Sequence, residues 1–147
     1  MKGYDDLELA ILSCVLQKPK LMENTILKDK YFIKHKKIWM FLKAFYKRFK
    51  CFDLTLMYSI SKNKYRVVEY IVWLIEQEAT PSAFKQYEEE LVNKFYEKKK
   101  DKYISENIYQ LAMDLICRNI SLEDFKNELE KVYKNAELIM KEMEGKK

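Results

Sequence analysis

Apolar residues recur along most of this chain at intervals of three and four positions, the spacing that places side chains on one face of an α-helix. The segment of about 34–49 is the clearest example, because lysines occupy its opposite face. We therefore expect an amphipathic helix that packs against a core. Its apolar face consists of Ile38, Phe41, Leu42, Phe45 and Phe49.

Shorter helices are predicted on both sides of this segment. A first helix runs through Leu9–Leu16 and ends near Pro19, because the residue before proline disfavours the α conformation. A short second helix passes through Leu21 to Leu27, and Asp53 is placed to cap another short helix. The segment of about 66–78 is densely apolar, so we expect it to be the most buried element. Its apolar residues include Val67, Val68, Tyr70, Ile71, Leu74 and Ile75.

The second half of the chain predicts two long helices. Thr80 and Pro81 are typical of a helix start, and the helix from Phe84 to Cys117 would be roughly 50 Å long at about 1.5 Å per residue. Ser121 is placed to cap the last helix, and the link 118–120 is short enough to make the pair antiparallel.

These two helices share a heptad-like apolar seam. Its residues are Ile104, Ile108, Leu111 and Leu115 on the first helix and Leu122, Phe125, Leu129, Val132, Ala136, Ile139 and Met143 on the second. The seam either closes the hairpin or also recruits a second copy. We favour self-association, as a dimer or higher oligomer, because two helices do not bury both seams completely.

The fold expected from these elements is all-α, with a globular multi-helix head (1–80) followed by a long helix and an antiparallel helical hairpin (81–147). The chain has only 2 glycines and 2 prolines, which disfavours an all-β fold rich in turns. No apolar run is long enough to span a membrane. The 3 cysteines have no disulfide or zinc spacing and are interpreted as buried, which suits a reducing cytoplasm.

Several classes of chemistry are disfavoured. The glycines are Gly3 and Gly145, so there is no phosphate-binding glycine loop, and the single histidine, His35, is too little for a histidine-based metal site or triad. Paired acids such as Glu88–Glu90 belong to helix faces where solvated charge is the ordinary explanation. We therefore expect no enzyme, no cofactor and no metal.

A basic segment is the alternative functional candidate. Residues 1–80 carry 15 basic and 9 acidic side chains, and residues 28–50 hold nine of the basic ones. Lysines interleaved with aromatic rings are one way to hold single-stranded DNA, although a solvated helix face is the commoner meaning. The candidate face for nucleic acid or an acidic partner is Lys36, Trp39, Lys43, Lys47 and Lys50.

The order of motifs resembles the N-terminal domain of DnaB-type replicative DNA helicases. The resemblance spans roughly residues 7–140 and depends on the order and spacing of individually weak motifs. They are Leu7–Leu16 followed by Lys18–Pro19, Tyr31–Phe32 with His35 and Ile38, Asp53–Thr55, Tyr70–Ile71 with Leu74, and Thr80–Ser82 with Tyr87.

The resemblance implies a helical head with a dimerising hairpin, which in that family forms the collar of a ring helicase and contacts primase and the helicase loader. The ATPase motor is absent from these 147 residues. Two interpretations follow, a domain of a longer helicase or a standalone protein, such as a phage protein, that engages replication machinery. The expected partners are a replicative helicase, its loader or primase.

Overall fold

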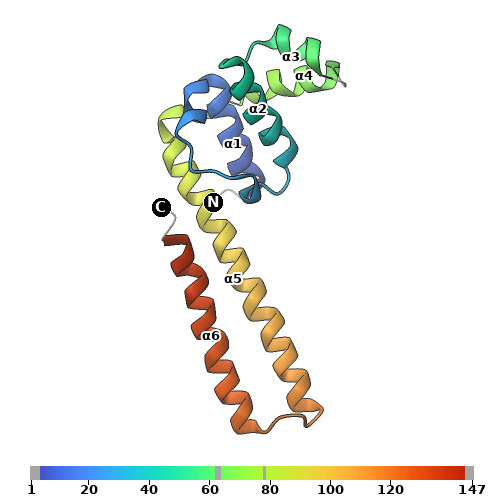
Figure 1. Cartoon of the computed structure of the whole chain (residues 1–147), viewed down its shortest axis with the longest axis vertical. Helices are drawn as coiled ribbons and strands as arrows, with labels where there is room; N and C mark the ends of the chain where they lie inside the picture. Colours follow the sequence, from blue (N-terminus) through green and yellow to red (C-terminus); the bar gives the residue numbers. More distant parts are fainter. Residues whose placement is uncertain (1–3, 62–63, 78, 145–147) are drawn as a thin grey trace. The chain divides into compact units, whose positions relative to one another are not determined.

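The chain is all-helical wherever its structure, a computed structural model, describes it: residues 4–61, 64–77 and 79–144. This confirms the all-α part of the predicted fold class. Short 3-10 helices span Pro19–Glu23 (η1), Asp29–Tyr31 (η2) and Pro81–Ala83 (η3). The α-helices, labelled in Figure 1, are α1 (Tyr4–Gln17), α2 (Lys36–Phe49), α3 (Leu54–Ile60), α4 (Lys64–Ile75), α5 (Phe84–Ile116) and α6 (Leu122–Glu144).

The helices form two compact units. The first unit ends at Leu91 and contains α1 to α4 with the first turns of α5. The second unit begins at Val92 and contains the rest of α5 together with α6. The division falls inside α5, whereas the sequence placed its boundary at residue 80, where the long helix starts.

Helix α1 is the most buried helix among the described residues of the first unit. Its residues 11–16 are all buried, and it packs against α4 and η1. The expectation that the segment 66–78 would be the most buried is wrong. On α4, Ile71 and Leu74 are fully buried, but Val72, Trp73 and Ile75 are exposed because the neighbouring helices cover only one side of it.

A buried carboxylate joins α1 to the start of α2. Glu8 is fully buried, and its side chain accepts hydrogen bonds from three consecutive backbone N–H groups, those of Ile33 (2.6 Å), Lys34 (3.4 Å) and His35 (3.4 Å). His35 is the residue immediately before α2, and a carboxylate is a favourable acceptor at the N-terminal end of a helix. Glu8 thereby holds the backbone that leads into α2.

The segment between α1 and α2 differs from its prediction. Only η1 is helical in the region expected to form a second helix, and Leu27 lies in an extended stretch between η1 and η2. Side chain Glu88 of α5 accepts hydrogen bonds from the Thr25 hydroxyl and from the backbone N–H of Ile26. These tertiary hydrogen bonds give the extended segment partners outside a helix. The segment therefore does not have to become helical to satisfy its backbone polar groups.

The helix caps predicted at Asp53 and Ser121 are confirmed. The Asp53 carboxylate accepts from the Leu56 N–H at 2.9 Å, and the Ser121 hydroxyl accepts from the Asp124 N–H at 3.1 Å. Helix α5 ends in a Schellman motif, in which Arg118 has a left-handed φ of 60° and the Asn119 N–H reaches the Asp114 carbonyl at 2.8 Å.

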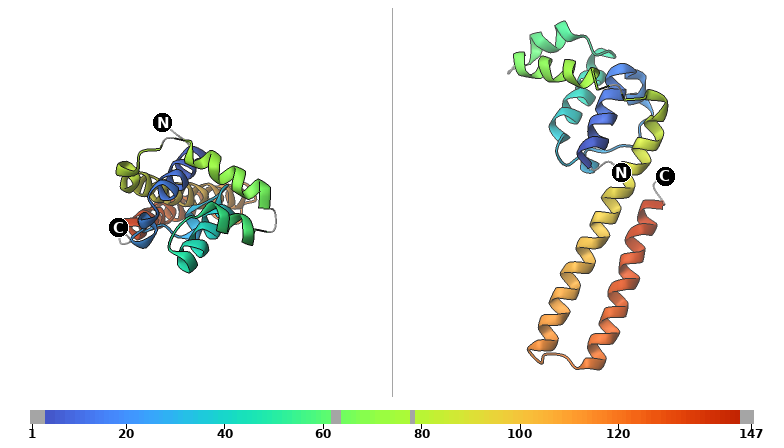
Figure 2. Two further views of the ribbon diagram at one scale, coloured as in Figure 1. Left: turned by 90° about the horizontal axis from the view of Figure 1, so that it is seen from above. Right: turned by 180° about the vertical axis from the view of Figure 1, so that it is seen from behind.

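In the second unit, the later part of α5 and the whole of α6 lie side by side and run in opposite directions (Figures 1 and 2). Across the pair, the Asn135 amide donates to the Tyr103 hydroxyl at 3.1 Å, and Lys99 pairs with Glu142 at 3.5 Å. Among the described residues, no helix combines the length and the apolar character needed to cross a membrane.

Replacing Glu8 tests the junction between α1 and α2. Glu8→Ala removes the shared acceptor of three backbone N–H groups and truncates a fully buried side chain, so we expect the free energy of unfolding to fall by about 2–3 kcal/mol. Urea unfolding followed by circular dichroism measures this loss. The control is Asp6→Ala, at an exposed position of the same helix, which should change stability by less than about 0.5 kcal/mol. Equal stability of the two variants would contradict the role given to Glu8.

Candidate functional site

The apolar seam predicted from the sequence lies on α5 and α6 of the second unit and is unevenly covered. Val132 (6% exposed) and Ala136 (3% exposed) are buried. Leu122, in contrast, is 59% exposed and does not contribute to a closed seam. The seam residues that are only half-buried are Ile104, Ile108, Leu111, Leu115, Phe125, Leu129 and Ile139.

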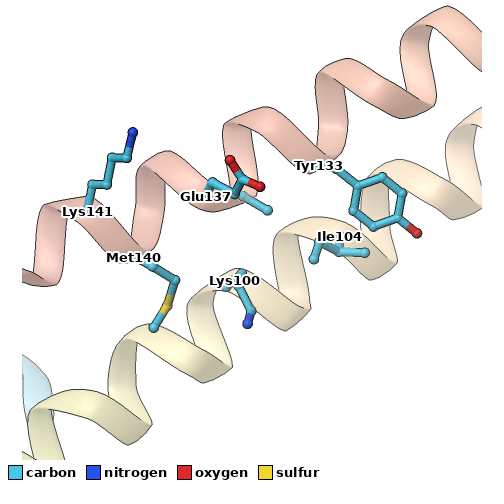
Figure 3. Close-up of a pocket in the computed structure, with 7 residues that line it drawn as sticks. Lys100, Ile104, Tyr133, Glu137, Met140 and Lys141 are labelled. Carbon is cyan, nitrogen blue, oxygen red and sulfur yellow. The ribbon is translucent and has the colours of Figure 1, made fainter.

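Side chains leave a groove of about 450 Å³ between the two helices. Figure 3 shows Tyr133 and Met140 of α6 directed towards α5, where Ile104 lies, while Lys141 points away. The groove lies in the middle of the seam, beside the buried Ala136. The small alanine side chain leaves space there that neighbouring larger side chains do not fill, so the hairpin is incompletely packed.

A second apolar stripe on α5 was not recognised in the sequence. Tyr109 (68% exposed), Met113 (39%) and Ile116 (73%) recur at helical spacing. They lie roughly 140° around the helix from the seam at 3.6 residues per turn. One partner helix covers one face, so this stripe stays in solvent. The sequence does contain these spacings of four and three residues. They were overlooked because the seam residues lie between them along the chain.

The basic face of α2 has exposed lysines without the expected aromatic platform. Lys36, Lys43, Lys47 and Lys50 are exposed, and Lys43 pairs with Asp29 at 2.7 Å. Trp39, however, is fully buried, so its placement on this face is wrong. The reason is Phe32, which precedes α2 and stacks on the indole ring with centroids 4.5 Å apart.

Tyr46, another aromatic residue of α2, is also buried. Its hydroxyl donates to the Glu23 carboxylate at 2.9 Å. Burial, with the hydrogen bond and charge of Glu23, raises the pKa of the Tyr46 hydroxyl. Neither aromatic ring of this face is therefore free to stack on a base.

His35 has a structural position. Its Nδ1 shares a hydrogen bond of 3.0 Å with the hydroxyl of Tyr70 on α4, while its backbone N–H donates to Glu8. The ring of Tyr70 stacks in turn on Trp73, with centroids 5.6 Å apart. Within the described part of the chain, no group of three or more His, Cys, Asp or Glu side chains is arranged to hold a metal ion.

Exposed apolar side chains also gather on α3 and on α4, and for α4 the sequence predicted burial. They are Leu54, Leu56, Tyr58 and Ile60 on α3 and Val72, Trp73 and Ile75 on α4. The two helices pack against each other and leave a groove lined by both. Residues are apolar around most of α4, and that pattern alone does not tell which face a neighbour covers.

Comparisons of this chain with protein-family models, with curated proteins and with solved structures gave no match. The site is therefore defined by its own geometry. Three surfaces stand out: the partly covered apolar faces of α5 and α6, the lysine face of α2, and the groove between α3 and α4.

The three cysteines differ in environment, and two of them contradict the expectation of burial. Cys14 is buried, while Cys51 and Cys117 are exposed because each follows the end of a helix. Burial raises the pKa of the Cys14 thiol to about 11. At pH 8 its reactive thiolate is therefore scarce as well as shielded.

Thiol titration tests this assignment. With Ellman's reagent at pH 8, we expect two fast-reacting thiols in the folded protein and a third after unfolding in urea. Cys14→Ser should leave the two fast thiols unchanged, and Cys51→Ser should remove one of them. Three fast thiols in the folded wild-type protein would contradict the burial of Cys14.

Proposed function

We propose that this chain is an interaction module of DNA replication. In this proposal the first unit is a globular head, the second unit is a hairpin through which two or more copies associate, and the assembly binds a replicative helicase, its loader or primase. The chain itself performs no catalysis. The proposal joins the surface described above to the resemblance with the N-terminal domain of DnaB-type helicases.

Self-association rests on one observation: a single chain covers its α5 and α6 faces incompletely. Most of the seam is half-buried, and Tyr109 and Ile116 are about as exposed as surface polar residues despite their apolar character. Burying apolar surface stabilises by about 25 cal/mol per Å². A second hairpin laid against these faces gains that free energy, whereas a lone hairpin leaves it unused.

The replication partners are proposed from the resemblance, and the positions of its motifs support it. Asp53 caps α3, the Thr80–Ser82 motif leads into α5, and α6 follows α5 after a short turn. His35 and Tyr70, which both belong to the resemblance, bond to each other across the head. Several residues of these motifs therefore have structural roles in the chain.

Binding of single-stranded DNA is the alternative function, and the structure favours it less. Lysines alone provide electrostatic attraction, which is independent of sequence and falls steeply with salt. The stacking that such proteins add to it needs exposed rings. Trp39 and Tyr46 are buried, so the α2 face lacks the platform that distinguished this alternative from an ordinary solvated helix.

The exposed α5 stripe gives the first test of self-association. The chain mass is 17.9 kDa, and we expect sedimentation velocity at micromolar concentration to give a multiple of it. Tyr109→Glu with Ile116→Glu places charges on the stripe without touching the packing inside the hairpin, and should return the protein to a single chain. Asn127→Glu with Lys134→Glu, at exposed positions of α6, is the control and should leave the multiple unchanged.

The seam is tested separately by Phe125→Glu with Leu129→Glu. Both residues are half-buried, so circular dichroism must first show that the helices persist. We expect loss of the oligomer and loss of partner binding together. A wild-type protein that sediments as one chain, or an unchanged mass in both double variants, would refute self-association.

Partner capture tests the replication part. The purified chain is used as bait in a nuclease-treated bacterial lysate, and bound proteins are identified by mass spectrometry. Recovery of a helicase, loader or primase with the wild-type chain, and its loss with the Phe125→Glu, Leu129→Glu variant, is the expected result. Recovery of DNA alone before nuclease treatment, and of no replication protein after it, would favour the alternative.

A further inference from the structure

The groove between α3 and α4 has the character of a binding surface. Its volume is about 420 Å³, and it lies wholly within the first unit. Trp73 is 42% exposed and Tyr58 is 49% exposed, so large aromatic side chains border it from both helices. Exposed apolar clusters of this kind mark interaction sites in soluble proteins. The lining residues are Tyr58, Val68, Glu69, Val72, Trp73 and Glu76.

The groove side of α4 has a regular pattern. Glu69, Val72, Trp73 and Glu76 stand at positions i, i+3, i+4 and i+7, which share one helix face. Two carboxylates therefore flank an apolar centre and lie about 10 Å apart along the helix at 1.5 Å per residue. The matching pattern on a second helix is one apolar anchor between two cations, also seven residues apart.

The charge of the groove is negative. Among its described lining residues, Glu69 and Glu76 are acidic and none is basic. Helix α3 contributes no charged side chain, and Arg66 of α4 lies outside the lining. The carboxyl-terminal end of α4, at Ile75, adds the negative end of the helix dipole beside Glu76. A positively charged segment is therefore favoured over an acidic peptide or a nucleic acid.

The central ring of the groove is held in place before any partner arrives. Trp73 stacks on Tyr70 with an interplanar angle of 22°, and the Tyr70 hydroxyl is hydrogen-bonded to His35. His35 is itself bonded to the buried Glu8. Ordering an aromatic side chain in advance lowers the entropic cost of binding, and tryptophan is the residue type most enriched among interface hot spots.

We propose that the groove between α3 and α4 binds an amphipathic, basic α-helix of another protein. A large apolar side chain of that helix packs against Trp73 and Tyr58, and two lysines or arginines seven residues apart pair with Glu69 and Glu76. Added salt should lower the affinity by screening the two charge pairs. The contribution of the apolar anchor should not change with salt.

A second copy of this chain is the competing occupant. Lys36 and Lys43 on α2 are also seven residues apart, with Met40 between them. One observation disfavours this helix: Lys43 already pairs with Asp29 at 2.7 Å, which leaves it less available to a groove carboxylate. The groove therefore fits a separate partner better than it fits α2 of a second copy.

The inference is independent of the proposed function. It concerns the first unit, whereas self-association is assigned to α5 and α6 of the second. The Tyr109→Glu, Ile116→Glu variant should therefore bind a groove peptide as the wild-type chain does. A protein that does not self-associate would contradict the proposed function alone, and a groove that binds no peptide would contradict this inference alone.

The test selects partners without assuming their sequence. A display library of helical peptides with randomised side chains is selected on the full chain, and the enriched peptides are labelled for fluorescence anisotropy. We expect them to carry two basic residues seven positions apart around an apolar anchor. Trp73→Ala and the charge reversal Glu69→Lys with Glu76→Lys should each weaken binding at least tenfold.

The matched control is Glu123→Lys with Glu130→Lys, which reverses two exposed charges at the same seven-residue spacing on α6. It should bind the peptides within about twofold of the wild type, and circular dichroism verifies that all variants are folded. Enrichment of no peptide, of peptides without the basic pair, or of peptides that bind the Trp73→Ala variant equally well would overturn the proposal. So would a fall in solution mass caused by Trp73→Ala without peptide, which would identify a second copy as the occupant.

Discussion

The carboxylate of Glu8 lies where α1, the start of α2 and α4 depend on one another. It accepts hydrogen bonds from three backbone N–H groups ahead of α2, one of which belongs to His35. The ring of His35 is in turn hydrogen-bonded to Tyr70 on α4. Tyr70 in turn supports Trp73 at the surface. A buried charge is tolerated only when its hydrogen bonds are satisfied. Losing any one bond of this network should therefore lower the stability of the fold substantially.

A different constraint governs the second unit. Helix α5 has apolar residues on two faces, and α6 covers one of them. Two antiparallel helices bury a single seam between them, and the second apolar face of α5 stays exposed. The sequence therefore has more apolar surface on this helix than one chain can hide, which is the physical basis for proposing an assembly.

Local and tertiary information contributed differently to what the sequence predicted. The caps at Asp53 and Ser121, the long helix and the amphipathic α2 depend on neighbouring residues, and the sequence predicts them closely. Burial depends on which distant element covers a face, and there the predictions were wrong: Trp39 is hidden beneath Phe32, and much of α4 is exposed. The α3–α4 groove was missed for the same reason, since the apolar residues of α4 were interpreted as core.

The exposure of Cys51 and Cys117 has a practical consequence. One thiol lies in the first unit and the other at the end of α5 in the second, while Cys14 is protected by burial. The chain thus carries its own pair of attachment points for spin labels, one on each unit, without any engineered cysteine. The width of the distance distribution between two such labels would report how rigidly α5 transmits motion from one unit to the other, and how a bound helix or a second copy alters it.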